Sequence, residues 1–396
     1  MKIAHISDLH LGKVVNGYSM IENQRHILAQ IADKVIRKEV DAVFLAGDIY
    51  DSPVPEAESM DVLNEFLSSL MKAKIDVFMI AGNHDRGDLI DYGASLLEAM
   101  DIHVCGKWKG KMECVDMLDR YGPLHVWCLP YVTPQAVNRY IDDPRRKADT
   151  FTDAVRYALS TADKDPNERN VLIAHQYIEG AVVTAEGSED YLSLAGEIVS
   201  ASALKGFDYV ALGHVHTAQA VGDNTIRYCG APLNYAISEI GQERSFTLIY
   251  LGEKGSIRIS TVALEPLRPM VRLRGTFLSL MDQKMIDRWS DQYVSIVLEE
   301  EKEIPNVINV LKEKYPYVMT VSYADGRVRL EGTTETHTEI NEGVLTQVRE
   351  LRLKEPNQLF AEFYELRNEE AMTQEQKDYV ASVIKEAFGG GENETG

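Results

Sequence analysis

The amino-acid sequence predicts a layered α/β domain, followed by a smaller α+β unit and C-terminal helices. Three observations lead to this prediction: short apolar runs alternate with helical stretches, prolines interrupt that pattern near residue 268, and two apolar stripes follow Pro356. A length of 396 residues is too long for one simple domain. We therefore expect three segments, at 1–267, 268–350 and 351–396.

The first segment opens with a strand-length apolar run and then a helical stretch at 21–40, where Ile27, Ile31 and Val35 lie on one face of an amphipathic helix. Further apolar runs alternate with polar or helical stretches, as in βαβ units, before consecutive strands follow. This pattern is typical of a sheet with helices packed on it. The expected strands are 2–6, 42–46, 77–80, 126–129, 171–174, 209–212, 226–229, 246–251 and 257–262.

The second segment begins where Pro266 and Pro269 interrupt the strand pattern. A mixture of strands and one short helix indicates a small α+β unit. We expect a strand at 293–298, a helix that opens at Pro305 and ends before Pro316, and strands at 318–323 and 328–331.

The third segment is expected to be helical, with a disordered tail at 389–396. Thr373 and Gln376 have the spacing of a capping box between its two helices. Helices this short cannot bury both stripes against each other, so the stripes either pack on the body of this chain or bind a partner. The stripes are Leu359, Phe360, Phe363 and Tyr364, and then Tyr379, Val380, Val383, Ile384 and Phe388.

Composition and charge argue against some classes of protein. No apolar stretch has the roughly 18 residues of a membrane helix, and the polar N-terminus lacks the core of a signal peptide. We therefore expect a cytoplasmic protein with reduced cysteines. The formal net charge of −21 is unusual for a protein that holds a phosphate backbone unaided. Two small basic clusters either meet DNA or are solvated loop charge: Lys107, Lys109 and Lys111, and Arg145, Arg146 and Lys147.

Five short polar motifs stand where expected strands end. Loops beyond the carboxyl ends of parallel strands converge on the ligand site of an α/β sheet, so these motifs can meet around one point. A single motif is weak evidence, because Asp8 could cap a helix and Asn83 could occupy a turn. Five of the ten histidines fall in the set, however, which argues against coincidence. The motifs are Asp8-Leu9-His10, Gly47-Asp48, Gly82-Asn83-His84-Asp85, Ala174-His175 and Gly213-His214-Val215-His216.

Carboxylate, amide and imidazole ligands in combination suit two borderline divalent metal ions. The one-residue spacing within Asp8/His10 and within His214/His216 directs both side chains of each pair to the same side of an extended segment. Asp48 is the natural bridging carboxylate. Paired metal ions about 3.5–4 Å apart activate a hydroxide and clamp the oxygens of a displacement at phosphorus, so the motifs predict phosphoester hydrolysis.

These motifs, in this order, resemble the signature of the calcineurin-like metallophosphoesterases, whose layered sandwich is therefore the expected fold. Longer segments are similar to the nuclease subunits of bacterial DNA repair complexes, and the similarity covers nearly the whole chain. This sequence differs from many of these relatives at Arg86, where they have a small residue, and at Thr217, where a basic residue or glycine is common. The similar segments are 7–13, 46–51, 129–131, 207–216, 228–233 and 238–239.

The resemblance implies a mechanism and a ligand set. Two divalent ions, manganese in this family, would activate a bridging hydroxide without a covalent protein intermediate. His84 would be the catalytic histidine, beside the bound phosphate. The ligands of one metal would be Asp8, His10, Asp48 and His216, and those of the other Asp48, Asn83, His175 and His214.

The resemblance also implies a substrate and partners. It predicts a DNA nuclease of repair, recombination and replication, with 3′–5′ exonuclease activity on duplexes and endonuclease activity on single strands and hairpins. The middle segment would act as a capping domain, and the C-terminal helices would fasten to an SbcC-type coiled-coil ATPase. That partner must bind the ATP, because the chain has no GxxxxGK[ST] phosphate loop. A homodimer within a heterotetramer is expected, formed through the helix at 21–40.

Two other functions fit the same motifs. A two-metal site could act on a small phosphoester, as a phosphatase or cyclic-nucleotide phosphodiesterase does. Against the protein-phosphatase branch, Asp85 stands where that branch has Glu, and residues 47–52 lack its Asp-Arg-Gly ending. A non-catalytic scaffold is the other alternative, but such proteins usually lose ligands, and here the seven inferred ligands and His84 are all present.

Overall fold

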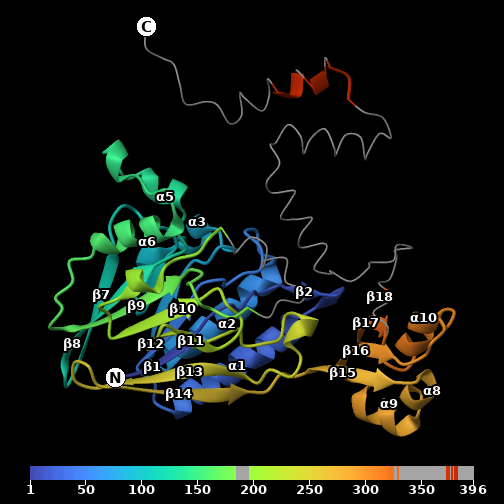
Figure 1. Cartoon of the computed structure of the whole chain (residues 1–396). Coiled ribbons are helices and arrows are strands. Elements are labelled where there is room, and N and C mark those ends of the chain that lie inside the picture. The colour runs from blue at the N-terminus through green and yellow to red at the C-terminus, as the bar shows by residue number, and fades with distance from the viewer. Residues whose placement is uncertain (184–195, 325–327, 330–371, 375, 378, 382–396) are drawn as a thin grey trace. The chain divides into compact units, whose positions relative to one another are not determined.

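A computed structural model describes residues 1–183, 196–324, 328–329, 372–374, 376–377 and 379–381 (Figure 1). The chain divides into two compact units, Met1–Val321 and Ser322–Gly396. The first apolar stripe expected after Pro356 and the expected tail lie outside the described residues, as does most of the second stripe.

Two six-stranded sheets form the centre of the first unit. The first has the order β14 (Ile257–Leu264), β13 (Arg244–Leu251), β1 (Lys2–Ile6), β4 (Ala42–Ala46), β5 (Asp76–Ile80) and β6 (Ile102–Cys105). The second has the order β11 (Gln219–Val221), β12 (Asp223–Tyr228), β10 (Tyr209–Gly213), β9 (Arg169–His175), β8 (Gly122–Leu129) and β7 (Glu113–Asp119). Because β1, β4 and β5 pair in parallel, as do β8, β9 and β10, their carboxyl ends share one edge of each sheet.

Three apolar layers hold the sheets and helices together. Side chains alternate along β4, so that Phe44 enters the core between the sheets while Val43 and Leu45 face helices. Helices α1 (Ile21–Arg37) and α2 (Ala57–Lys72) cover the first sheet, and α5 (Pro134–Asn138) and α6 (Phe151–Ser160) cover the second (Figure 1). The layered α/β sandwich expected from the sequence is confirmed.

A smaller sheet follows Pro269. Strands β15 (Met270–Gly275) and β16 (Tyr293–Leu298) pair in parallel, and β17 (Val318–Tyr323) lies next to β16. Asn23 of α1 exchanges two hydrogen bonds with the backbone of Arg268, at 3.0 and 2.8 Å, just before this sheet begins. The connecting helices are α8 (Phe277–Leu280), α9 (Gln283–Trp289) and α10 (Val307–Lys312).

All the strands expected in the first segment occur, with ends shifted by a few residues. The helix expected at 21–40 ends at Arg37, and the helix expected from Pro305 is confined to α10. Strands β6, β7, β11 and β15 were not expected, because edge strands and strands with polar outward positions lack a continuous apolar run. The remaining elements are β2 (Val14–Val15), β3 (Tyr18–Ser19), α3 (Gly87–Ile90), α4 (Ala94–Glu98), β18 (Val328–Arg329) and 3-10 turns at Pro144–Arg146, Ala201–Leu204 and Ile237–Glu239.

Two local expectations are confirmed. Thr373 and Gln376 form the expected capping box, with Thr373 N donating to Gln376 Oε1 at 2.9 Å and Gln376 N donating to Thr373 Oγ1 at 3.3 Å. All four cysteines are free; Cys114 is exposed and the other three are buried. None of the helices in the described part of the chain combines the length and apolar character needed to cross a membrane.

The inter-sheet core gives a test of the fold. Phe44 is fully buried, and its ring meets that of Phe78 edge-to-face with centroids 5.4 Å apart. We expect Phe44→Ala to lower the free energy of unfolding by about 3–5 kcal/mol, because it leaves a cavity between two rigid sheets. Urea denaturation measures this change. Leu118→Ala, at a side chain that is 79% exposed, is the control and should change stability by about 0.5 kcal/mol or less. Equal stability of the two variants would contradict the buried position of Phe44.

Candidate metal centre

Five loops meet where strands of the two sheets end. Backbone hydrogen bonds continue the pairing of β1 with β4 into the loops, from Asp8 N to Gly47 O and from His10 N to Asp48 O, both at 3.0 Å. Parallel strands of the second sheet bring their own ends to the same place. The structure thus brings together all eight predicted site residues: Asp8, His10, Asp48, Asn83, His84, His175, His214 and His216.

Four of these residues adopt a left-handed backbone conformation, with φ of 53° at Asp8, 43° at His10, 50° at Asp48 and 101° at His214. Each such conformation costs about 1–3 kcal/mol in a residue other than glycine, and it persists only where the surroundings hold it. Hydrogen bonds to the site's own carboxylates supply that restraint. His214 N donates to Asp8 Oδ1 at 2.8 Å, and His84 N donates to Asp48 Oδ1 at 3.0 Å.

Glycines in two of the motifs are a packing requirement. A Cβ atom at Gly82 would overlap the carboxylate of Asp48, and one at Gly213 would overlap the carbonyl oxygen of Ala46. Gly82, in the loop after β5, lies against the loop after β4. Gly213, at the end of β10, lies against the end of β4 in the other sheet. Glycine therefore allows the ligand side chains that follow it to come within bonding distance of each other.

Apart from His84, which also lies within reach of His10 and Asp48, the possible ligand atoms form two groups that share Asp48. In one group, His175 Nε2 lies 3.2 Å from Asp48 Oδ2 and 3.0 Å from Asn83 Oδ1, while His214 Nδ1 lies 2.9 Å from the same Asn83 oxygen. In the other, His10 Nε2 lies 3.6 Å from Asp48 Oδ2 and 3.1 Å from His216 Nε2. Asp8 belongs to the second group, since Asp8, His10 and His216 offer atoms within 4.8 Å of one another.

Hydrogen bonds behind two imidazoles fix which ring nitrogen faces the centre. His175 Nδ1 donates to the carbonyl oxygen of Ala46 at 2.8 Å, and His216 Nδ1 donates to the carboxylate of Glu239 at 3.1 Å. In the neutral rings the two Nε2 atoms therefore carry lone pairs.

Those lone pairs face other acceptor atoms. His175 Nε2 faces the Asp48 carboxylate, and His216 Nε2 faces His10 Nε2. His214 Nε2 is buried and has no hydrogen-bond partner among the described residues. Acceptors this close repel one another unless a proton or a metal ion lies between them, and the mixed carboxylate, amide and imidazole set fits divalent metal ions.

The electrostatics of the site also favour the binding of positive charge. Burial alone would raise the pKa of Asp48, but the imidazole of His175, followed by that of His10, holds it well below its ordinary value. Burial alone would lower the pKa of His175, yet the Asp48 carboxylate raises it to about 9. Burial and the neighbouring His175 lower the pKa of His214 to about 3. The field around Asp48 thus attracts positive charge, which a metal ion can supply in place of a proton.

His84 is half-buried at the rim of the site. Its Nδ1 donates to the backbone carbonyl of Asp51 at 3.1 Å, and its ring packs edge-to-face on His10 with centroids 4.8 Å apart. This hydrogen bond fixes the ring and leaves Nε2 as the nitrogen available to a ligand.

Glu239, to which the sequence assigned no role, lies directly behind His216. Glu239 is 4% exposed, and its carboxylate accepts hydrogen bonds from His216 Nδ1, from Tyr235 N at 2.8 Å and from Arg244 Nη2 at 2.6 Å. Burial alone would raise its pKa, but His216 and Arg244 lower the pKa to about 2. Only the similarity of residues 238–239 to relatives could have drawn attention to it.

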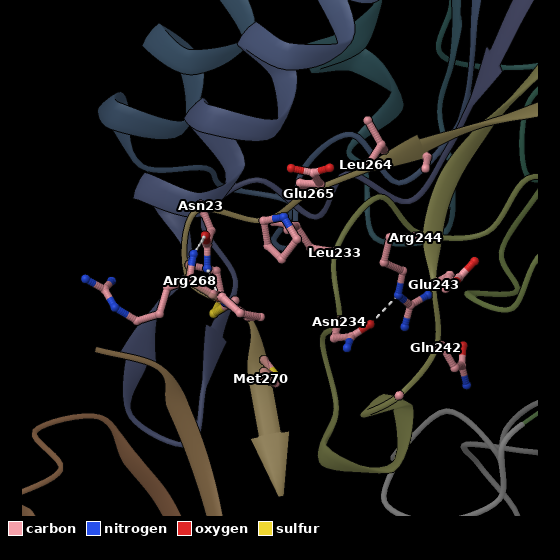
Figure 2. Close-up of a pocket in the computed structure, with 15 residues that line it drawn as sticks. Asn23, Leu233, Asn234, Gln242, Glu243, Arg244, Leu264, Glu265, Arg268 and Met270 are labelled. Atoms are coloured by element: carbon pink, nitrogen blue, oxygen red, sulfur yellow. Dashed lines mark hydrogen bonds between the residues drawn. The ribbon is translucent and has the colours of Figure 1, made fainter. Parts of the chain in front are cut away.

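Arg244 holds this arrangement from the outside. It donates to the His216 carbonyl oxygen at 2.7 Å as well as to Glu239, and Figure 2 shows its side chain turned toward Asn234 on the wall of a pocket. The pocket also includes Asn23 and Arg268, which join α1 to the start of the smaller sheet. Arg244 therefore connects His216 to the residues that line this pocket.

Asp85 is a half-buried carboxylate to which the sequence also assigned no role. It accepts hydrogen bonds from Ile49 N at 3.0 Å, Tyr50 N at 2.9 Å and Gly82 N at 2.9 Å, so it ties the loop after β4 to the loop after β5. Burial and the nearby Asp48 raise its pKa to about 6. In the sequence, the position of Asp85 at the end of the Gly-Asn-His-Asp motif was the feature that could have indicated a role for it.

Carboxylates pair with part of each basic cluster. Such pairing fits solvated loop charge better than a free phosphate-binding surface. The pairs are Lys107 with Asp88 at 2.6 Å, Lys109 with Asp91 at 2.9 Å and Arg145 with Asp143 at 2.9 Å.

Comparison with known proteins adds to this geometry. Residues 1–218 match the family model for calcineurin-like phosphoesterases, and residues 266–368 match the SbcD_C model, described as the type 5 capsule protein repressor C-terminal domain. The chain is 28% identical over 326 residues to the D subunit of nuclease SbcCD from Staphylococcus epidermidis, covering 81% of this chain and 85% of that protein. A solved dimetal phosphatase from Danio rerio aligns over 66% of this chain and 95% of its own, at 12% identity and a TM-score of 0.38. A solved Thermus thermophilus protein aligns over 66% of this chain and 98% of its own, at 14% identity and a TM-score of 0.38.

The orienting role of Glu239 can be tested by metal binding. We expect Glu239→Gln to weaken binding of divalent metal about 10–100-fold, because the loss of the carboxylate charge weakens its hold on His216 and Arg244. Isothermal titration of the metal-free protein with Mn²⁺ measures the affinity, and thermal melting checks the fold. The control is Glu243→Gln, which removes an exposed carboxylate four residues away. Unchanged affinity in a folded Glu239→Gln variant would contradict this role.

Proposed function

We propose that this chain, which belongs to the calcineurin-like phosphoesterase family, is the DNA nuclease subunit of a complex with an SbcC-type coiled-coil ATPase. The chain is a metallophosphoesterase and resembles SbcD nuclease subunits in both matched regions. Its similarity to the D subunit of nuclease SbcCD supports DNA as the substrate and an ATPase as the partner. Family membership supports divalent metal ions as the cofactors.

One observation carries the proposal for the site: two groups of acceptor atoms meet at the shared carboxylate of Asp48. A shared carboxylate between two ligand groups is what a dinuclear centre requires. We assign Asp8, His10, Asp48 and His216 to one metal ion, and Asp48, Asn83, His175 and His214 to the other.

The protein's own groups then prepare the reaction. When bound, two divalent ions supply the attacking hydroxide and neutralise charge on the phosphate oxygens. Ala46 and Glu239 keep His175 and His216 in the tautomers that present Nε2 to the centre. His84, anchored through Nδ1 to the Asp51 carbonyl, stabilises the phosphate charge or protonates the leaving oxygen through Nε2, a role that requires the imidazolium form with a proton on each ring nitrogen.

The finer parts of the proposal follow the resemblance. We assign manganese as the metal, 3′–5′ exonuclease activity on duplexes, and endonuclease activity on single strands and hairpins. Residues 268–350 form the capping domain, and residues 351–396 bind the ATPase, which carries the ATP. The chain forms a homodimer through helix α1, within a heterotetramer that includes the ATPase. This complex acts in the cytoplasm in DNA repair, recombination and replication.

His84→Ala tests the nuclease assignment. With Mn²⁺ and end-labelled single-stranded or duplex DNA, we expect the variant to cleave about 10²–10⁴-fold more slowly than the natural chain, because it loses a group that acts in the transition state. Gel electrophoresis of the products measures cleavage, and metal analysis should find the same metal content in both proteins. His103→Gln is the control, since His103 lies on β6.

A small ester separates the nuclease from its main alternative. Bis-p-nitrophenyl phosphate should be hydrolysed by the natural chain and not by His84→Ala. Hydrolysis of this ester with no cleavage of DNA, even after addition of the ATPase partner and ATP, would favour an enzyme of small phosphoesters.

Deletion of residues 356–396 tests the partner-binding segment. The shortened chain should still nick single-stranded DNA with Mn²⁺, because the proposed ligands all precede residue 217. It should no longer co-purify with the SbcC-type ATPase when the two are co-expressed. A shortened chain that still binds the ATPase would place the partner's contact elsewhere.

A further inference from the structure

A second cluster of metal-binding side chain types lies on the hairpin of β7 and β8. Cys114 and Asp116 are two residues apart on β7, so their side chains lie on the same face of the strand. Asp116 stands directly opposite His125 of β8 in the antiparallel register. Strand β7 is the edge of the second sheet, and these three residues are separate from the strand-end loops of the metal centre.

The distances in this cluster are close to those of a tetrahedral zinc site. Cys114 Sγ lies 3.6 Å from Asp116 Oδ1, and that oxygen lies 2.6 Å from His125 Nδ1. Zinc bonds of about 2.3 Å to sulfur and about 2.1 Å to oxygen place the two ligand atoms about 3.6 Å apart at a tetrahedral angle. His125 Nδ1 and Asp116 Oδ1, now 2.6 Å apart, would have to separate to about 3.4 Å to bind the same zinc ion. This is a shift of less than about 1 Å between two side chains of one hairpin.

Glu168 orients the histidine of the cluster from the other side. His125 Nε2 lies 2.6 Å from Glu168 Oε2, and Glu168 directly precedes β9. This contact directs Nδ1 of the ring toward Asp116 and Cys114. A histidine held through one nitrogen by a carboxylate, with the other nitrogen facing two further ligands, is the usual arrangement around protein-bound zinc.

We propose that Cys114, Asp116 and His125 bind a zinc ion, with water as the fourth ligand and Glu168 orienting His125. The chemistry of the ligands favours zinc over manganese, because a thiolate and an imidazole are softer ligands than the carboxylates that manganese prefers. Cys114 is exposed, so the ion can reach it from solvent. Binding displaces the Cys114 thiol proton and the His125 Nδ1 proton to solvent, leaves the Nε2 proton on Glu168's side of the ring, and forms the zinc–sulfur and zinc–nitrogen bonds without any change of oxidation state.

The ion would join the edge strand to its neighbour. Three ligands from two strands, oriented by a residue at the start of a third, hold the outer corner of the second sheet together. An edge strand is otherwise open to fraying and to pairing with other chains. This proposal concerns structure at the sheet edge and does not depend on the proposed nuclease activity.

Cobalt provides a selective test in the full-length chain. Co²⁺ bound to a thiolate gives a sulfur-to-metal charge-transfer band in the near ultraviolet, which ligands of the Asp, His and Asn type do not give. We expect the band in the natural chain, its loss in Cys114→Ser and at least tenfold weaker binding in His125→Asn. His103→Gln is the matched control and should keep the band.

Zinc content gives the second measurement. After dialysis against excess Mn²⁺ with trace zinc, the natural chain should retain one zinc ion per chain that Cys114→Ser does not retain. Manganese-dependent DNA cleavage should be equal in both. Absence of the charge-transfer band in the natural chain, or equal zinc retention by Cys114→Ser, would overturn the proposal and leave His125 as an ion-pair partner of Asp116 and Glu168.

Discussion

The crowding of acceptor atoms around Asp48 is the constraint on which the rest of the structure depends. With neutral imidazoles, nitrogen and oxygen lone pairs would face one another at 3.1 and 3.2 Å, with little water to screen them. Such an arrangement opposes folding unless a proton or a metal ion lies between these atoms. The chain must therefore hold these atoms in place with interactions that do not involve the metal, because folding stability is only a small difference between large terms.

Those interactions come from the two sheets. The core between them fixes the distance from β4 to β9 and β10, so that the Ala46 carbonyl of one sheet meets His175 of the other at 2.8 Å. Strain is concentrated in the loops beyond the strand ends, where Asp8, His10 and Asp48 adopt positive φ. The rigid layers behind these loops allow the strain to persist. A sandwich with two covered sheets is thus a suitable support for ligands that repel each other.

The same division explains what the sequence could predict. Buried strands such as β4 are apolar at every position, so they and the polar motifs that end them stand out along the chain. Within each sheet, the convergence of those motifs follows from parallel pairing, and the core between the sheets brings the two sets together. Glu239 and Asp51 act on His216 and His10 across long stretches of chain, and no local pattern marks such contacts. The sequence did not indicate the proposed zinc site of Cys114, Asp116 and His125 for a related reason: the register of a polar edge hairpin brings these residues together, and no motif marks them.

The net charge of −21 limits how this chain could bind DNA, its proposed substrate. Affinity for a phosphate backbone grows with the number of phosphates that cations neutralise, but Lys107 and Lys109 already pair with Asp88 and Asp91. In the proposed reaction, positive charge at the phosphate would come instead from metal ions held by Asp48 and its neighbours. A site of this kind recognises one phosphoester at the point of cleavage and gives little hold on the strand around it. Holding the strand requires charge from another chain, which is a physical reason for such a nuclease to work as a subunit.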